Sequence, residues 1–422
     1  MEEQKINKKI TFSIIAVLLI VLVAIGATYA YFSAQGTTGT QTVTTGTLTM
    51  NFDKEGSVVT VDGIIPIKDS EIKTKAAAFP FSVTNTGTEH MNITIKLKDI
   101  AIDPELKNID FRWGLYNADT NKGISFGIFK YASNGGEEII YRDSIIDAGS
   151  SKKNYVLRIW IHDNNQIQNE MQGKTFNGKI EVTGTAVEYT DESCFTFSNG
   201  SITDYDAATC GTDVVIPRTI GGVVVTGIGD PFGLNSLSSK GLTSVIIPDS
   251  VTAIQSYALN NNQLTHLTIP TSLTWISSEA INNNPLSSLI IPEGLRTTVY
   301  DSFANNKLTT FIFSGETLGE TMLSGNPVTD VVLMDGVKAI VMLGLSNIKM
   351  TTIEIPSSVN EIEAGAFNSN PNLTEIVVRG KNSIDDFVCT GEYSLSGTGA
   401  ECVPGLTTEG GLPAGVNVIY RP

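Results

Sequence analysis

The sequence predicts a mainly β protein in which an antiparallel β-sandwich precedes a solenoid of parallel strands. Three observations support this fold class. A phrase of the form Leu-x-x-Ile-x-Ile-Pro returns about every 22 residues in the second half of the chain. Residues 37 to 188 alternate apolar and polar positions between Asn/Gly/Asp turns, and an uncharged apolar segment comes before both regions. A chain of 422 residues is long for one core, so several structural units are expected.

Residues 1–32 are predicted to export the protein. Three lysines precede the uncharged apolar run Ile14–Ile25, and the small residues that follow predict signal-peptide cleavage after Ala30. The alternative is an uncut helix, because Ile10–Phe32 carries no charge and is long enough, at roughly 20 residues, to span a bilayer. With the lysines on its N-terminal side, such a helix would be a membrane anchor that leaves the rest of the chain outside. Both alternatives predict a protein that is either secreted or tethered at the cell surface.

Residues 34–188 are predicted to form the antiparallel β-sandwich. Five segments alternate apolar and polar residues, as strands with one buried face do: Thr47–Phe52, Phe79–Val83, Met91–Leu97, Tyr155–Ile161 and Gly178–Val187. No helical periodicity of useful length separates them. Many short strands without helices favour two packed sheets.

This region resembles the camelysin/TasA family of exported bacterial proteins. The resemblance lies in Ala27–Ser33, Gly46–Met50, Phe81–Gly87 and the stretch from Trp160 to Lys179, and it covers roughly residues 1–187. It implies a jelly-roll-like sandwich, processing by a dedicated signal peptidase and, in some members, assembly into biofilm-matrix fibres. Camelysin is described as a metallopeptidase. The chain has no His-Glu-x-x-His motif, and its histidines are isolated in sequence, so that activity is not carried over.

Residues 229–380 are predicted to form the solenoid. The repeated phrase occupies Leu242–Pro248, Leu264–Pro270, Leu286–Pro292, Leu308–Phe313, Val328–Leu333, Met350–Pro356 and Leu373–Val378. A unit this short cannot bury its own apolar face, so successive copies must stack. The fourth and sixth residues of each phrase, such as Val245 and Ile247, point inward, and the proline ends the strand.

The same repeat contains recurring asparagines after its second apolar pair. They are Asn260–Asn262, Asn282–Asn284, Asn305, Asn306 and Asn368. Stacked asparagines would form hydrogen bonds along the solenoid; the alternative is that they serve only as turn residues that tolerate a left-handed backbone.

The whole pattern resembles the BspA-type leucine-rich repeat of bacterial surface proteins over Gly222–Gly380, with Gly365–Phe367 closest to its usual ending. The resemblance implies binding to proteins or cell surfaces and no catalysis. Residues 189–228 are then a linker and N-terminal cap, and residues 381–422 a C-terminal cap or tail.

Four cysteines bracket the repeats and fit an oxidising compartment. Cys194 lies close to Cys210 and Cys389 close to Cys402, so local pairing is the simplest of three connectivities. Each closed loop of roughly 15 residues would stabilise the fold by about 3 kcal/mol in the chain-entropy model. The alternative, a zinc site, lacks Cys-x-x-Cys spacing and a histidine near a cysteine, so neither a metal site nor another cofactor is predicted.

The fifth residue of each repeat strand points away from the solenoid core. These residues are Ile246, Thr268, Ile290, Ile312, Val332, Glu354 and Val377. Five of the seven are aliphatic, and stacking would align them on the open face of the sheet. We predict a partner-binding strip centred on Ile246, Ile290, Ile312 and Val332, with Ser288, Thr310 and Asp330 as polar neighbours. The alternatives are that this strip is covered within the chain, or reflects only the strand propensity of branched residues.

The composition excludes several classes of function. The net charge is −16 and the basic residues form no stripe, which argues against binding of nucleic acid. The sequence contains no P-loop, no Gly-x-Ser-x-Gly and no metal triad, so no catalytic residue is predicted. We therefore predict a non-enzymatic bacterial protein that mediates protein–protein adhesion through the repeat sheet, with membrane contact only if the N-terminal helix stays uncut. The alternative is a biofilm-matrix protein that self-assembles into fibres through the sandwich.

Overall fold

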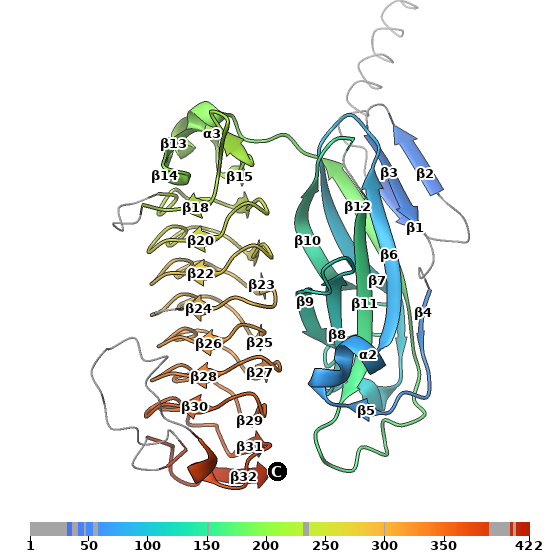
Figure 1. The fold of residues 1–422 in the computed structure, drawn as a ribbon, viewed down its shortest axis with the longest axis vertical. Helices are drawn as coiled ribbons and strands as arrows, with labels where there is room; N and C mark the ends of the chain where they lie inside the picture. The colour runs from blue at the N-terminus through green and yellow to red at the C-terminus, as the bar shows by residue number, and fades with distance from the viewer. Residues whose placement is uncertain are drawn as a thin grey trace, which may run out of the picture.

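The computed structural model describes residues 32–35, 41–45, 48–53, 58–149, 152–230, 236–298, 300–387, 406–407 and 411–422. They form two elongated β structures that lie side by side and are joined at one end (Figure 1). The N-terminal segment, with the predicted cleavage after Ala30, is outside the described residues. Within the described ranges, no helix has the length and apolar character needed to cross a membrane.

The first structure is a sandwich of two mostly antiparallel sheets. One sheet has the order β1 (Phe32–Gln35), β12 (Phe176–Ala186), β7 (Met91–Ile102) and β10 (Glu138–Ile146), with β4 (Val58–Val61) also paired to β12. The other has the order β2 (Gln41–Thr45), β3 (Leu48–Asp53), β6 (Ala77–Asn85), β11 (Lys153–His162), β8 (Phe111–Asn117) and β9 (Gly123–Ile128), and β5 (Pro66–Ile67) adds to β11 in parallel. All five strands predicted by alternation are present.

The sandwich core comes from the inward residues of both sheets. Strand β7 alternates buried and half-buried positions over most of its length, as the sequence pattern predicts. Its Ile93 and Ile95 lie in one apolar cluster with Leu157 of β11 and Trp113 of β8. Sequence analysis did not predict strands β8 and β10, because neither shows a clean alternation of apolar and polar residues. Every residue of Phe111–Tyr116 in β8 is buried, and β10 contains two bulges.

Short helical turns connect these strands. They are η1 (Asp69–Glu71) and α2 (Ile72–Lys75) between β5 and β6, and η2 (Pro104–Leu106) between β7 and β8. The turns η1 and α2 place Asp69 and Ile72 on the side of the sandwich that meets the second structure.

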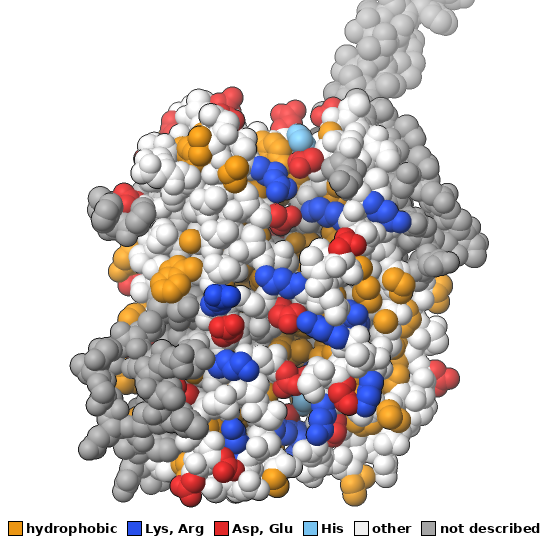
Figure 2. Space-filling view, viewed as in Figure 1, with side chains coloured by type: hydrophobic (Ala, Val, Ile, Leu, Met, Phe, Trp, Pro, Cys, Tyr) orange, Lys and Arg blue, Asp and Glu red, His pale blue; other side chains and the backbone are white. Residues whose placement is uncertain are grey.

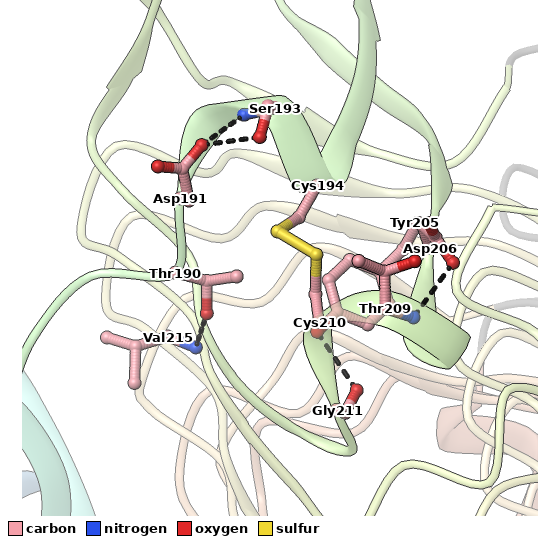
Figure 3. Close-up of a disulfide and its surroundings, with 10 residues drawn as sticks. All are labelled: Thr190, Asp191, Ser193, Cys194, Tyr205, Asp206, Thr209, Cys210, Gly211 and Val215. Carbon is pink, nitrogen blue, oxygen red and sulfur yellow. Dashed lines mark hydrogen bonds between the residues drawn. A yellow bond between two sulfur atoms is a disulfide. The ribbon is translucent and has the colours of Figure 1, made fainter.

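A disulfide-tied cap begins the second structure. It consists of η3 (Glu192–Cys194), the hairpin β13 (Phe195–Ser198) and β14 (Ser201–Tyr205), and α3 (Ala207–Cys210). Figure 3 shows Cys194 of η3 bonded to Cys210 of α3, so the predicted local pairing is confirmed here. Cys389 and Cys402 are outside the described residues. A second hairpin, β16 (Thr219–Ile220) with β17 (Val223–Val224), follows the cap.

The repeats stack into a solenoid with two ladders of parallel strands. The ladder next to the sandwich, here called the front sheet, contains β15 (Asp213–Val215), β19 (Ser244–Ile246), β21 (His266–Thr268), β23 (Ser288–Ile290), β25 (Thr310–Phe313), β27 (Asp330–Leu333), β29 (Thr352–Ile355), β31 (Glu375–Arg379) and β32 (Asn417–Arg421). The opposite ladder, here called the back sheet, contains β18 (Gly227–Ile228), β20 (Ala253–Ile254), β22 (Trp275–Ile276), β24 (Thr297–Thr298), β26 (Thr317–Leu318), β28 (Ala339–Ile340) and β30 (Glu361–Ile362). The short turn η4 (Ile384–Asp386) follows β31.

The register of the front sheet follows the sequence repeat. Leu267 pairs with Leu289, Phe311 with Val331, and Ile353 with Ile376. The inward residues of successive rungs, including Ile247, Ile269 and Ile291, are buried in one continuous core. At the far end, Leu406 and Leu412 join this core and β32 extends the sheet beyond β31.

Buried asparagines link several rungs to the previous one. The side-chain nitrogen of Asn284 donates to the carbonyl oxygens of Leu259 and Ile281, and its oxygen accepts from the backbone nitrogen of Leu264. Asn262, Asn326 and Asn370 make equivalent bonds, and Asn306 makes the donor bonds, to the carbonyl oxygens of Ile281 and Phe303. The prediction that asparagines bond along the solenoid is confirmed, although Asn370 rather than Asn368 occupies the ladder position.

Candidate functional site

The front sheet faces the sandwich, not solvent, and we call this contact the seam. Ile246 and Val332 are buried, Ile290 packs against the sandwich core, and Ile312 packs in a cluster shared by both structures. The structure therefore agrees with the alternative in which the strip is covered within the chain. The predicted strip is not an open binding face, because apolar side chains of the sandwich in the same molecule cover it. Its members are Ile246, Ile290, Ile312 and Val332.

The centre of the seam is apolar. Its cluster joins residues of both structures: Ile67, Ile72, Tyr116, Ile128 and Trp160 from the sandwich, and Val332 and Met334 from the solenoid. Phe126, Ile109, Ala76 and Ile312 pack around it half-buried. Trp160 is almost fully buried, and its indole nitrogen donates to Asp69 at 3.1 Å, which satisfies the one polar atom of the ring.

Charged pairs surround this apolar centre, and most place a cation on the sandwich and an anion on the solenoid. Lys73 lies 3.1 Å from Glu293, Lys130 lies 2.5 Å from Asp330, and Lys153 lies 3.6 Å from Asp249. His266 and Asp143 form a pair of the opposite sense at 3.3 Å. Figure 2 shows lysine, arginine, aspartate and glutamate side chains gathered along the line where the two structures meet.

The charge distribution along the chain supports this complementarity. Residues 189–422 contain 9 Lys/Arg and 23 Asp/Glu, whereas residues 34–188 contain 16 Lys/Arg and 19 Asp/Glu. Most of the negative charge therefore belongs to the solenoid, and the sandwich places several of its lysines at the seam. Each half-exposed pair contributes only about 0–1 kcal/mol, so their main effect is on the orientation of docking rather than on its strength.

One buried histidine connects the two structures directly. The Nδ1 of His162 in β11 donates to Asp69 at 2.8 Å, and its Nε2 donates to Glu354 in β29 at 2.6 Å. Asp69 also accepts from Arg112 at 3.0 Å, and Glu354 from Arg379 at 2.6 Å. Five ionisable side chains thus form one chain of hydrogen bonds across the seam.

The electrostatics of this chain favour a charged imidazole. Burial and the neighbouring Arg112 both oppose the imidazolium, but the Asp69 and Glu354 carboxylates outweigh them and raise the pKa of His162 to about 9. Burial would raise the pKa of Asp69, yet His162 and Arg112 hold it at about 2. Burial likewise opposes ionisation of Glu354, and the hydrogen bonds from His162 and Arg379 bring its pKa to about 2. Both nitrogens of His162 are therefore donors over the ordinary pH range.

A cavity of about 260 Å³ lies at one end of the seam. Its sandwich side includes Arg112, Asn164 and Gln166, and its solenoid side includes Glu354 and Arg421. Arg421 donates to the carbonyl oxygen of Asn164 at 2.8 Å, which closes the seam beside the cavity. The cavity walls carry both signs of charge, so they favour no single charged ligand.

Sequence analysis missed the hydrogen-bonded network of His162. His162 and Glu354 are 192 positions apart, and nothing in the spacing relates them. One signal was present: Glu354 is the charged member of an otherwise mostly aliphatic outward ribbon. A carboxylate at such a position predicts a buried cationic partner, since an unpaired buried charge is costly.

Comparisons with known families confirm both resemblances. Residues 232–342 and 314–397 match the model described as BspA type leucine rich repeat region, with six copies. Residues 5–111 match the model described as Camelysin metallo-endopeptidase. No curated protein sequence matches the chain.

One solved structure with similarity to the chain is the crystal structure of a leucine rich cell surface protein from Faecalibacterium prausnitzii A2-165. It is 20% identical with a TM-score of 0.27, and the alignment covers 52% of this chain and 63% of that one, less than two thirds of its length. A likeness this distant does not establish a common fold.

The described residues do not fit the metal site that the name of the camelysin model implies. They contain no group of three or more His, Cys, Asp or Glu side chains placed to hold a metal ion. His90 bonds Asp147 at 3.0 Å, His162 uses both nitrogens on carboxylates, and His266 pairs with Asp143. Each histidine has its own carboxylate partner and none shares a donor set with another.

Proposed function

We propose, on the premise that residues 232–397 are BspA-type leucine-rich repeats, that this chain is an exported, non-enzymatic bacterial surface protein that binds another protein through its solenoid. The observation that carries the proposal is the six-copy match together with the rigid stack that those copies form. Solenoids of this kind present extended surfaces whose side chains vary from rung to rung while the core stays constant. The N-terminal segment would export the chain and, if uncut, tether it.

The partner surface that we propose is on the back-sheet side, because the front sheet is occupied by the sandwich. Four large side chains there are partly exposed: Tyr257 (38%), Trp275 (41%), Tyr300 (37%) and Met342 (39%). Trp275 belongs to β22, and the other three follow back-sheet strands. Trp and Tyr are enriched among the residues that carry most binding energy at protein interfaces.

The surroundings of these aromatic residues are acidic. The hydroxyl of Tyr257 donates to Glu279 of the next rung at 2.8 Å, and Glu320 lies near enough to Tyr300 to raise the pKa of its phenol. Burial and the nearby Asp301 in turn raise the pKa of Glu320. An aromatic surface with unneutralised carboxylates suits a partner that presents Lys or Arg, through ion pairs and cation–π contacts.

The test is binding of the fluorescently labelled chain to intact cells of its source. We expect Y257A/W275A/Y300A to reduce binding at least tenfold without a change in circular dichroism. Ile167→Ala, which removes a side chain that is 81% exposed on the sandwich, is the matched control and should bind like the wild type. Equal binding by the triple variant would contradict the proposed surface. Unchanged binding to cells whose surface proteins have been removed by protease would contradict a protein partner.

A further inference from the structure

Strand β9 is an outer strand of the sandwich that carries little protection of its own. It pairs with β8 on one side only, so alternate backbone N–H and C=O groups point away from the sheet. Its sequence, Gly123–Ile128, contains no charged residue and no proline, and its pairing with β8 contains a single register shift, between Leu115 and Tyr116. Natural sheets usually guard such an edge with lysine, proline or a bulge that blocks pairing with another chain.

The neighbouring outer strand differs in this respect. Strand β10 forms the corresponding edge of the other sheet, and it contains two register shifts and the charged residues Arg142 and Asp143. Bulges and charges of this kind disfavour pairing with a second strand. With one register shift and no charged residue, β9 is therefore the less guarded of the two edges.

The solenoid covers this edge with backbone and side-chain contacts. The backbone nitrogen of Gly123 donates to the Glu293 carboxylate at 2.8 Å, and the backbone nitrogen of Glu293 donates to the Gly123 carbonyl at 3.0 Å. The ammonium of Lys122 donates to the carbonyl oxygen of Thr271 at 2.5 Å. A Cβ built on Gly123 would lie only 3.2 Å from the Cβ of Glu293, so these two segments of the chain are in direct contact.

Apolar contacts continue the cover along the strand. Ile128 at the end of β9 is buried in the cluster that contains Val332 and Met334, and Phe126 packs against that cluster. The first residue of β9 is thus held by a rung turn of the solenoid, and its last residues by front-sheet side chains. Without the solenoid, an uncharged strand and an apolar cluster would both face water.

We propose that the solenoid guards the β9 edge, and that the freed edge pairs with β9 of a second copy of this chain. Two copies of one edge strand can pair antiparallel about a twofold axis, which gives a closed, self-complementary contact. Covalent linkage keeps the solenoid at a high effective concentration near the β9 edge. In the intact molecule the solenoid, rather than a second copy of the chain, therefore occupies this edge. This inference is independent of the surface that binds a partner on the back-sheet side.

The experiment opens the seam in the full chain with E293K/D330K. These substitutions place positive charge beside Lys73, Lys122 and Lys130 of the sandwich. The matched control is E316K/E320K, which makes the same change of charge at the rung of β26, on the side turned away from the sandwich. Amide exchange reports whether β9 is uncovered, and size-exclusion chromatography with light scattering reports the mass.

In E293K/D330K we expect the β9 amides to exchange at least tenfold faster and the chain to dimerise at concentrations where the wild type and the control are monomeric. Addition of Phe126→Lys to the open variant should restore the monomer, because a lysine in β9 disfavours edge pairing. If β9 exchange is unchanged in E293K/D330K, I312E/M334E is the second means of opening the seam. Unchanged exchange in both variants, a monomer with uncovered β9, or a dimer that survives Phe126→Lys would each overturn the proposal.

Discussion

The sandwich and the solenoid are both β structures, but their stabilising contacts span very different distances along the chain. In the sandwich, Val182 pairs with Ile95, 87 positions earlier. In the solenoid, Leu289 pairs with Leu267, one repeat of 22 positions earlier. The sandwich core therefore requires the whole domain at once, whereas each solenoid rung depends mainly on its two neighbours.

This difference determines where specific recognition within the molecule is encoded. Inward positions of the solenoid are constrained to be apolar in every rung, so they carry little information about a partner. Outward positions are free to vary, and in the front sheet they match one face of the sandwich: aliphatic at Ile312 and Val332, acidic at Glu354 opposite His162. The periodic structure thus supplies a flat surface, and the outward side chains of its rungs determine what docks on that surface.

The largest expected effect is a loss of stability, and it compares a core substitution in the sandwich with one in the solenoid. Phe176→Ala in the sandwich and Phe313→Ala in the solenoid each remove a fully buried ring, at a cost of about 3–5 kcal/mol. We expect Phe176→Ala to raise amide exchange throughout both sandwich sheets, because its contacts are shared by the whole domain. We expect Phe313→Ala to raise exchange mainly in the rungs around β25. Uniform loss of protection across the solenoid would contradict the view that rungs are stabilised by neighbours.

The second effect concerns the seam and depends on pH. His162 has a pKa of about 9 in the fold against an ordinary value of 6.5, so its contribution is complete below pH 6.5 and is lost as the pH rises through 9. The loss is on the order of 3 kcal/mol in the free energy of unfolding. Asp69 and Glu354 have lowered pKa values, so their contributions are complete above about pH 4.5 and are lost as the pH falls toward 2.

Chemical denaturation at pH 6 and pH 10 measures this loss. We expect the wild type to lose stability between the two values and His162→Gln to lose much less. His90→Gln is the matched control, because His90 contacts a carboxylate but takes no part in the hydrogen-bonded chain of His162. Parallel pH profiles for the wild type and His162→Gln would show that the histidine is not charged in the fold.

The smallest effect tests the link between rungs. Asn284→Ala leaves the backbone groups of Leu264 and Leu259 without their side-chain partner, and we expect a loss of about 2 kcal/mol. Gln263→Ala, at an exposed neighbouring position, should change stability by no more than about 0.5 kcal/mol. Thermal unfolding followed by circular dichroism compares the two, and equal midpoints would show that the ladder contributes little.

The sequence was sufficient for the solenoid because its information is local and repeated. Inward Ile247, Ile269 and Ile291 and the Cys194–Cys210 pair were predicted from spacing, and hydrogen bonding by the recurring asparagines was one of the two alternatives. In the sandwich, strands with a clean period of two were found. Strand β8, buried on both faces, and the bulged β10 were not.

The contact between the solenoid and the sandwich could not be predicted from sequence patterns, for a physical reason. An outward aliphatic ribbon has the same sequence whether it meets water, a partner or another part of its own chain. The side chains that cover it, including Ile72 and Trp160, come from a region without the 22-residue repeat and far away in sequence. Only the three-dimensional arrangement relates these residues to Val332 and Met334.

The most direct test of the seam is methionine oxidation in the folded protein. Met334 lies under the sandwich and is 4% exposed, whereas Met342, eight positions later on the back-sheet side of the same rung, is 39% exposed. After brief treatment with hydrogen peroxide, peptide mass spectrometry should find Met342 oxidised and Met334 protected, because a buried thioether is out of reach of the oxidant. Oxidation of Met334 as fast as that of Met342 would contradict the docking of the solenoid on the sandwich.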